Sequence, residues 1–298
     1  MSRYTPRQAW RQHWIWHPLQ ALPMYLTFKA LGLLPVDWAS GLGNRLGRLI
    51  GPRIRKPSEK SLSNLAIAFP EKSDEERHQI MRNMWGHLGR VVTEYASLGR
   101  IANSERITIY GDDYIRELYG KHPLLLVSGH IGHWEISPIV AKRHGMTMTG
   151  IYRPPNNRFV DRIIRGLRVD CGMTLLPRGT ESIRSAMKVL ATGGNLAMLI
   201  DQRSLRGKVV PFFGHPVKTA PTAAEMALRY GAKIIPVRVK RTDGARFDVI
   251  CEPPIERTPS GDQEADVDWL LERMNEVLER WLRDTPEQWL WPHRRWDL

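Results

Sequence analysis

Between residues 107 and 251 the sequence alternates short apolar runs with longer amphipathic stretches. Short apolar runs bounded by turn residues are typical of buried strands, whereas apolar residues at every third or fourth position indicate helices. This alternation predicts an α/β fold in which helices cover a sheet. The expected strands are 107–110, 124–128, 146–152, 174–176, 196–200, 233–239 and 247–251, and the expected helices are 111–120, 133–144, 157–170, 180–192 and 219–230.

The first hundred residues and the last helix have a helical pattern throughout. The expected helices are 6–16, 19–33, 38–50, 58–68, 73–98 and 264–283. Ser73 followed by Glu76 predicts a capping box at the start of helix 73–98. Gly41, Gly43 and Gly47 lie in a helical pattern with no strand before them, which favours helix packing over a dinucleotide-binding loop. We therefore expect one α/β domain, residues 36–298, preceded by a helical extension, residues 1–35.

The extension carries no charged side chain from residue 12 to residue 28, and it is rich in tryptophan and leucine. Pro18 and Pro23 interrupt this stretch, and a transmembrane helix needs about 20 mostly apolar residues. No small-residue cleavage site follows, and Lys29 ends the run, so a secretory signal is not expected. Tryptophan preceded by arginine suits a membrane surface. We expect an interfacial membrane segment; a helix packed on the protein core and a tilted single span are the alternatives.

The chain is strongly basic, with 44 Lys and Arg against 31 Asp and Glu and a net charge of +13. Such a charge favours a polyanionic partner, namely nucleic acid, an anionic membrane, a phosphorylated lipid or an acidic carrier protein. No nucleic-acid recognition motif is present, which leaves nucleic-acid binding as an alternative without support from a motif. Cys171 and Cys251 form neither a disulfide framework nor a zinc pattern, and they indicate a reduced, cytoplasmic-side protein.

The segment from Leu124 to Glu135 holds the most specific chemical pattern. A buried strand runs into a turn flanked by Gly129 and Gly132, where ligands bind in α/β sheets. His130 stands in this turn, and Glu135 follows five residues later. On a regular helix five residues turn by about 140°, so the two side chains can meet only if His130 precedes the helix. Glu135 would then accept a hydrogen bond from one imidazole nitrogen and leave the other as a base.

Two other interpretations of this segment stay open. His130 could be a turn histidine that bonds to the backbone. His133 is a rival base, and together with His130 it is a weak metal pair. No carboxylate or cysteine cluster nearby completes a metal site, so no metal is expected. The sequence also contains no GxSxG elbow, no GxxxxGK[ST] loop and no HExxH motif, which excludes the corresponding nucleophile, phosphate-loop and zinc sites.

Further motifs follow one another along most of the chain. They are Asn64–Pro70, Tyr152–Pro154 with Asn156 and Asn157, Asp201–Arg203 with Pro211–Gly214, Ala220–Thr222 with Ile235–Val237, and Pro286–Trp291 with His293–Trp296. The His130–Glu135 spacing resembles the HX4D/E motif of the lysophospholipid acyltransferase superfamily. With the other motifs, the chain resembles the bacterial lipid A late acyltransferases, the lauroyl and myristoyl transferases. His133 departs from the pattern, since many members carry Asn there, which puts the role of this position in doubt.

The resemblance implies a mixed sheet flanked by helices, as in glycerolipid acyltransferases. It implies an O-acyltransferase that moves a saturated acyl chain from acyl carrier protein to a hydroxyl of a lipid A precursor, without a cofactor. It implies a site at the cytoplasmic face of the bacterial inner membrane, on an anionic surface. His130 would be the general base and Glu135 its orienting partner. A different glycolipid or ornithine-lipid acceptor and a lipid hydrolase are the alternatives.

Five further residues are expected to bind substrate. Arg153 would donate to the oxyanion, a role that backbone amides at the Gly132 turn could also fill; a salt bridge or lipid-phosphate contact is the alternative for Arg153. Asn156 belongs to the same motif. Arg203 and Arg206 would hold lipid phosphates, and Asp201 would anchor an arginine or cap the end of its strand.

Two groups of aromatic residues, Phe212 with Phe213 and the tryptophans at the end of the chain, could either pack in the core or contact lipid. The stretch 203–218 is expected to be a loop, whose Phe212 and Phe213 suit either an acyl or membrane contact or core packing. The terminal tryptophans are expected to pack in the core rather than to contact the membrane.

Overall fold

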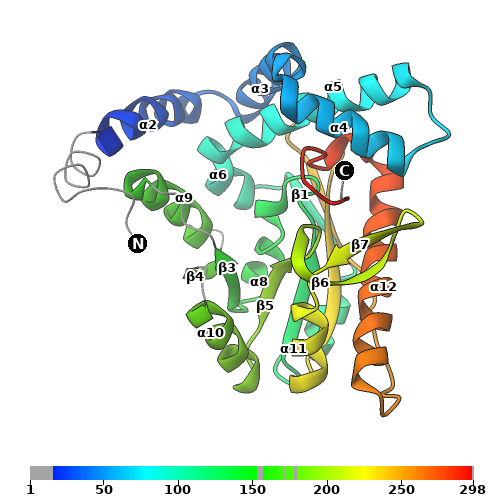
Figure 1. The fold of residues 1–298 in the computed structure, drawn as a ribbon. Coiled ribbons are helices and arrows are strands. Elements are labelled where there is room, and N and C mark those ends of the chain that lie inside the picture. The colour runs from blue at the N-terminus through cyan, green and yellow to red at the C-terminus, as the bar shows by residue number, and fades with distance from the viewer. Residues whose placement is uncertain (1–15, 153–156, 171, 178–179, 297–298) are drawn as a thin grey trace, which may run out of the picture.

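The computed structural model describes the chain except for residues 1–15, 153–156, 171, 178–179 and 297–298. Its centre is a seven-stranded sheet in the order β1-β9-β8-β2-β5-β3-β4 (Figure 1). The strands are β1 (Ile107–Tyr110), β2 (Leu124–Ser128), β3 (Met148–Tyr152), β4 (Met173–Pro177), β5 (Leu196–Leu199), β8 (Lys233–Arg241) and β9 (Phe247–Cys251). All neighbours are parallel except β8 and β9, so the expected mixed α/β sheet is confirmed.

Helices cover both faces of the sheet. They are α2 (His17–Leu33), α3 (Val36–Ile50), α4 (Arg55–Ala68), α5 (Asp74–Glu94), α6 (Leu98–Ala102), α7 (Asp113–Leu118), α8 (Ile139–Arg143), α9 (Arg158–Asp170), α10 (Thr180–Ala191), α11 (Thr222–Tyr230) and α12 (Gln263–Asp284). Single 3₁₀ turns are η2 (Gly51–Arg53), η3 (Tyr95–Ser97), η4 (Trp134–Ile136) and η5 (Pro286–Gln288). The capping box of Ser73 and Glu76 at the start of α5 is confirmed.

Two expected helices are shorter than their apolar patterns. The pattern 133–144 forms η4 and, after a break, the short helix α8. Pro138 stands immediately before α8. It has no backbone N–H, so it cannot donate the hydrogen bond to the carbonyl of Trp134 that a continuous helix would need. The pattern 73–98 ends as an α-helix at Glu94, and the chain continues as η3 and α6. The break before α8 leaves Glu135 in a single tight turn rather than in a long helix.

The stretch 203–218 is a β-hairpin, so its assignment as a loop was wrong. It forms β6 (Arg203–Phe212) and β7 (His215–Thr219), which pair in antiparallel fashion. Phe213 and Gly214 connect them with φ angles of 52° and 71°, as in the tight turns that join twisted strands. Phenylalanine rarely adopts a positive φ, which hides this turn from sequence patterns. Phe212 and Phe213 are buried, so core packing is their role.

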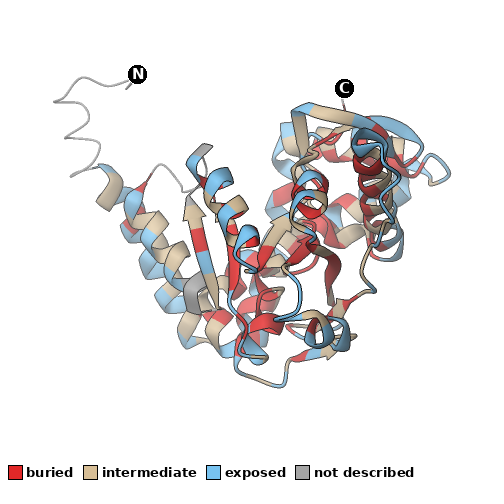
Figure 2. Cartoon of the chain, turned by 90° about the horizontal axis from the view of Figure 1, so that it is seen from below, coloured by how far each residue is buried: buried red, intermediate tan, exposed pale blue. Residues whose placement is uncertain are grey.

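Three apolar clusters hold the fold together. One lies between the sheet and α6, α7 and α8, and a second lies on the opposite face under α10, α11 and α12. A third joins α4, α5 and α12 to the hairpin turn and to the C-terminal Trp289, Trp291 and Trp296. The expected packing role of these tryptophans is thus confirmed. Figure 2 shows buried residues concentrated along the sheet and on the inner faces of the helices.

The described part of the extension is α2, which contacts α9, η3 and α3. Large apolar side chains on α2 are exposed, among them Leu19, Leu22 and Leu26. Among the described residues, no helix combines the length and the apolar character needed to cross a bilayer. The division of the chain at residue 35 stays a prediction.

Glycines let α3 and α5 approach closely, as the sequence pattern predicted. A Cβ added to Gly43 would overlap the carbonyl of Gly89, and a Cβ added to Gly89 would overlap that of Gly43. Gly47 meets the carbonyl of Trp85 in the same way, whereas the space around Gly41 is open. The contact between α3 and α5 is therefore one of backbone against backbone.

We predict that Gly89→Ala destabilises the protein by about 1–3 kcal/mol, because a methyl group in a packed contact forces the helices apart. Gly41→Ala is the matched control. It adds the same methyl group to α3 in open space and should stabilise the helix by up to about 1 kcal/mol. Urea unfolding followed by circular dichroism measures both. Equal stabilities of the two variants would contradict the proposed packing.

Candidate active site

His130 lies just beyond the carboxyl end of β2, where parallel strands present ligand sites. The backbone there turns sharply because Gly132 has a φ of 58°, and a Cβ at Gly132 would overlap the carbonyl of Val239. The expected need for glycine at this turn is thus met. However, the group that approaches Gly132 is the backbone of β8 and not a substrate.

Asp201 fixes both the backbone and the ring of His130. Its Oδ2 accepts a hydrogen bond from the His130 backbone N–H at 2.6 Å, and its Oδ1 lies 2.8 Å from His130 Nδ1. Trp289 Nε1 donates to the same Oδ2 at 2.7 Å. An ionised carboxylate only accepts, so Nδ1 carries the hydrogen and Nε2 keeps its lone pair. The imidazole is therefore held in one tautomer with Nε2 as the basic atom.

Asp201 itself is fully buried. Burial alone would raise the pKa of this carboxyl, but the charge and hydrogen bond of His130 outweigh burial and hold the pKa well below its usual value. Asp201 is therefore ionised at neutral pH. It does not line the cavity in front of His130, and both its oxygens are engaged by His130 and Trp289. Its contacts thus point to positioning of His130 rather than to the predicted anchoring of a substrate-binding arginine.

A cavity of about 1040 Å³ opens in front of His130. Glu135 lines the cavity together with His130, and so do Arg203 and Arg206 from β6. The remaining lining is largely apolar and comes mainly from β2, β3, β4 and β5, with further residues from β8, α9, α10, α11 and the turns η3 and η4. The structure therefore brings together four of the residues predicted from the sequence. Arg153 and Asn156 lie outside the described residues.

The carboxylate of Glu135 is held by hydrogen bonds from two aromatic side chains, one in η3 and one in η4. Its Oε1 accepts hydrogen bonds from Tyr95 Oη at 2.7 Å and from Trp134 Nε1 at 3.1 Å. Tyr95 and Trp134 also line the cavity. Tyr95 gave no signal in the sequence beyond its place on the apolar face of a helix. These two hydrogen bonds fix Glu135 beside the cavity, and its pairing with His130 stays a prediction.

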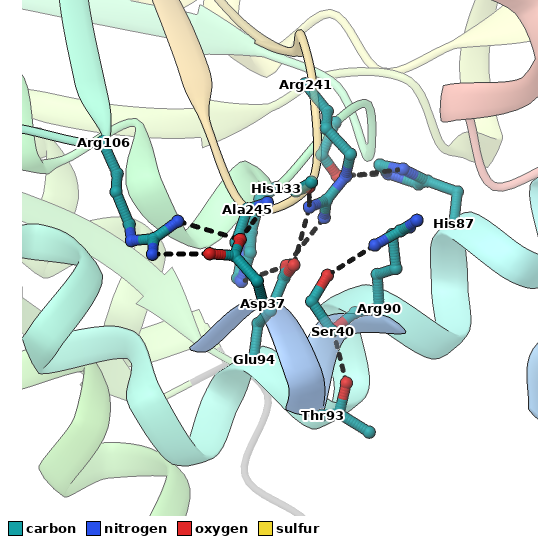
Figure 3. Close-up of polar contacts among 12 residues, drawn as sticks. Asp37, Ser40, His87, Arg90, Thr93, Glu94, Arg106, His133, Arg241 and Ala245 are labelled. Atoms are coloured by element: carbon teal, nitrogen blue, oxygen red, sulfur yellow. Dashed lines mark hydrogen bonds and ion pairs between the residues drawn. The ribbon is translucent and has the colours of Figure 1, made fainter. Parts of the chain in front are cut away.

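His133 points away from the cavity into a buried polar cluster (Figure 3). It is fully buried, with Nε2 3.7 Å from the carboxylate of Glu94, and burial lowers its pKa to about 4. Arg241 pairs with Glu94 at 2.6 and 2.7 Å and donates to His87, whose Nε2 contacts the carbonyl of Gly132 at 3.0 Å. This cluster supports the turn from behind, and His133 is not placed to act on a substrate.

Two backbone amides of the turn already have acceptors within the protein. The N–H of Gly132 donates to the carbonyl of Gln288 at 2.9 Å, and the N–H of His130 donates to Asp201. These two groups are therefore not free to bind an oxyanion. Arg153, the other expected oxyanion donor, lies outside the described residues.

His293 completes the surroundings of His130. The two imidazole rings meet edge to face with centroids 4.7 Å apart, and burial lowers the pKa of His293 to about 4. Within the described chain, potential ligand atoms of His130, Asp201 and His293 lie within 4.8 Å of one another, so these residues could hold a metal ion. A metal there would compete for the oxygens with which Asp201 binds His130 and Trp289.

Comparisons with known proteins agree with this geometry. A model of the family described as bacterial lipid A biosynthesis acyltransferase matches residues 19–297. The lipid A biosynthesis lauroyltransferase of Escherichia coli (strain K12) is 28% identical over 290 residues, covering 91% of each chain. The palmitoleoyltransferase of the same organism is 24% identical, covering 91% of this chain and 90% of that one.

A solved structure, the 1-acyl-sn-glycerophosphate (LPA) acyltransferase PlsC from Thermotoga maritima, is 13% identical. It matches with a TM-score of 0.36 over 78% of this chain and 98% of that chain. A likeness this weak adds nothing to the assignment, which stands on the family model and its extent. The chain belongs to the family of bacterial lipid A biosynthesis acyltransferases.

Proposed function

We propose that this protein transfers a saturated fatty acyl chain from an acyl carrier protein thioester to a hydroxyl of a lipid A precursor. One observation carries the proposal: an imidazole with a fixed tautomer, His130, faces a large cavity with an apolar lining and basic side chains. An acyl chain requires the apolar lining, and a phosphorylated glycolipid requires the basic groups. The names of two relatives, a lauroyltransferase and a myristoyltransferase, support transfer of a saturated chain, whereas a third relative is named for the unsaturated palmitoleoyl chain.

The proposed reaction needs one base and no cofactor. A hydroxyl is a weak nucleophile at neutral pH, so His130 Nε2 removes its proton while the oxygen attacks the thioester carbonyl. The tetrahedral intermediate collapses with loss of the thiolate, and the imidazolium returns its proton to the sulfur. Arg153 is the proposed donor to the oxyanion, and such a donor is typically worth about 3 kcal/mol. Asn156, from the same sequence motif, is proposed to bind substrate.

Two carboxylates support the base in this proposal. Asp201 orients the ring through Nδ1 and stabilises the imidazolium that forms during attack, as an aspartate does in a catalytic triad. Glu135 remains the proposed partner of His130 at the cavity side, where its negative charge favours the same imidazolium. Arg203 and Arg206 are proposed to hold the phosphates of the acceptor, since both line the cavity next to His130.

The proposed place of action is the cytoplasmic face of the inner membrane. The side chains of Trp16 and Leu19 are exposed at the start of α2, and those of Trp38, Leu42 and Leu46 are exposed on α3. Exposed arginines and a lysine lie among or just after the apolar residues of α3; they are Arg45, Arg48, Arg53, Arg55 and Lys56. Apolar side chains interleaved with basic ones bind anionic lipid surfaces. Both helices run along the upper edge of the molecule in Figure 1.

We predict that His130→Ala and Glu135→Ala each lower acyl transfer by about 10²–10⁴-fold, the usual contribution of a positioned acid–base group. The assay offers labelled acyl carrier protein and a tetra-acylated, Kdo-bearing lipid A precursor to the detergent-solubilised protein. His133→Asn is the control and should stay within a few-fold of wild type, because His133 does not line the cavity.

Three results would count against this assignment. If wild-type protein acylated only another glycolipid or an ornithine lipid, the lipid A precursor would not be the acceptor. Fatty acid released without any acceptor would indicate a hydrolase. Transfer that survives in folded His130→Ala would remove the proposed base.

Asp201→Asn tests the support of the base. The amide keeps the shape of the carboxylate but carries no charge, so we expect a loss of about 10²–10⁴-fold in kcat/KM. The acidic limb of its pH profile should also move to lower pH, because the imidazolium loses a neighbouring negative charge. Trp289→Phe, which removes only the indole N–H bonded to Asp201, should cause a much smaller loss. If folded Asp201→Asn protein had the wild-type rate and pH profile, Asp201 would not be the residue that orients His130, and Glu135 would be the remaining candidate.

Membrane binding is tested by the double substitution of Trp38 and Leu42 by Glu. Each large apolar side chain contributes about 1.5–3 kcal/mol on burial, so partitioning should weaken by roughly a hundredfold or more. Co-sedimentation with vesicles that contain phosphatidylglycerol measures this change. Tyr119→Glu, an exposed aromatic side chain just before β2 at the opposite edge of the sheet, should bind as wild type does. Equal loss in both proteins would contradict a specific membrane face.

A further inference from the structure

One part of the cavity lies directly on the sheet. Leu126 of β2 pairs with Ala197 of β5, Ala197 pairs with Gly150 of β3, and Gly150 pairs with Leu175 of β4. Residues that pair in register in a parallel sheet point to the same face. All four line the cavity, and Met173 of β4 does so as well. We call the space bounded by these five residues the sheet arm.

The floor of the sheet arm is made of small residues. Ala197 is only half-buried although β5 lies between β2 and β3, inside the sheet. Its neighbour on the other face of β5, Leu196, is buried. Gly150 has no side chain at all. The middle of the sheet is therefore left open on one face, where packed side chains would be expected.

Met173 closes the sheet arm. A Cβ added to Gly150 would fall on the terminal methyl, Cε, of Met173. The thioether end of Met173 thus occupies the place where a side chain at position 150 would stand. Met173 pairs with Met148, two residues before the pair of Gly150 and Leu175, so it stands on the side of the floor that is farther from the carboxyl edge and His130.

The reacting groups lie at the other end of the sheet arm. Ser128 pairs with Leu199, two residues beyond Ala197, and His130 follows Ser128. Tyr95 and Glu135 line the same cavity. The lining of the cavity therefore extends from the base at the carboxyl edge, across Ala197 and Gly150 on successive strands, to the methyl of Met173.

We propose that the sheet arm binds the acyl chain of the donor and that Met173 sets the longest chain accepted. This inference rests on the proposed acyl transfer and names the residues that decide its chain length. A linear apolar chain fits a narrow trough whose floor is an alanine and a glycine. The thioester carbonyl would then lie at His130, and the methyl end of the chain would meet Met173. Each further methylene that the trough accommodates favours binding by a factor of about four.

A second apolar part of the cavity lies on the opposite face of the sheet. Its lining includes Ile151, Met198 and Ile183, and the first two pack with the core under α10, α11 and α12. Met198 precedes Arg203 and Arg206 by only a few residues in the sequence, and all three line the cavity. This second part is the rival place for the transferred chain, and the test below distinguishes the two.

The test compares Met173→Ala with Gly150→Ala. Met173→Ala lengthens the trough, so the preferred saturated chain should become longer by about two carbons, with at least fourfold per added methylene in the ratio of kcat/KM values. Gly150→Ala pushes the methyl of Met173 toward the chain, so the preference should shift to shorter chains. The double variant should return toward wild type, because its new Cβ no longer meets Met173. Acyl carrier proteins charged with even-numbered chains serve as donors.

Controls separate this inference from the proposed function. Leu176→Ala changes the opposite face of the same strand, outside the cavity, and should leave the profile unchanged. Displacement of a fluorescent fatty acid by chains of increasing length gives the same ranking without any acceptor. If wild-type protein transferred no acyl chain to the lipid A precursor, but Met173→Ala still shifted the chain-length ranking in the displacement assay, the proposed acceptor would be wrong. The sheet arm would still be the binding site of the acyl chain. An unchanged ranking in Met173→Ala and Gly150→Ala, or a shift produced only by Ile183→Ala, would overturn the inference.

Discussion

A buried carboxylate, that of Asp201, ties together three distant parts of the chain. It follows β5, it holds the turn after β2 through His130, and it receives the indole N–H of Trp289 near the C-terminus. A buried charge without partners is very unfavourable, so these hydrogen bonds are a condition for the carboxylate to be there. The C-terminal segment therefore contributes one of the three hydrogen bonds that keep Asp201 in place beside His130.

The C-terminal segment docks through several contacts of the same kind. Asn64 of α4 donates to the carbonyls of Trp291 and His293 at 2.7 and 2.8 Å. The guanidinium of Arg295, fully buried, donates to Asn275 at 2.7 Å and to Thr219 at 3.1 Å. Helix α4, the hairpin and α12 thus all contact the last residues of the chain. Trp289 of this segment, assigned to packing from sequence, also donates a hydrogen bond to Asp201, and His293 packs against the ring of His130.

The His130 turn shows how far sequence patterns reach. A continuous apolar run followed by Gly129 predicted a buried strand from Leu124 to Ser128, just before His130, and β2 has that extent. The partner on Nδ1 was not predicted, because Asp201 is 71 residues away along the chain and only the order of the strands makes it a neighbour. The hairpin β6–β7 was missed because its turn uses Phe213 at a positive φ, a conformation that a phenylalanine in the sequence does not predict.

The sequence by itself determined the α/β class, the approximate positions of the seven strands of the main sheet, the packing role of the glycines of α3, and the family resemblance, because each depends on local periodicity or on short motifs. Only the tertiary structure decided which carboxylate touches the imidazole, which histidine is buried, and where the cavity lies on the sheet. These depend on which strands become neighbours. His130 and His133 look alike in the sequence, yet one faces the cavity and the other faces Glu94, because the backbone turns at Gly132, between the two.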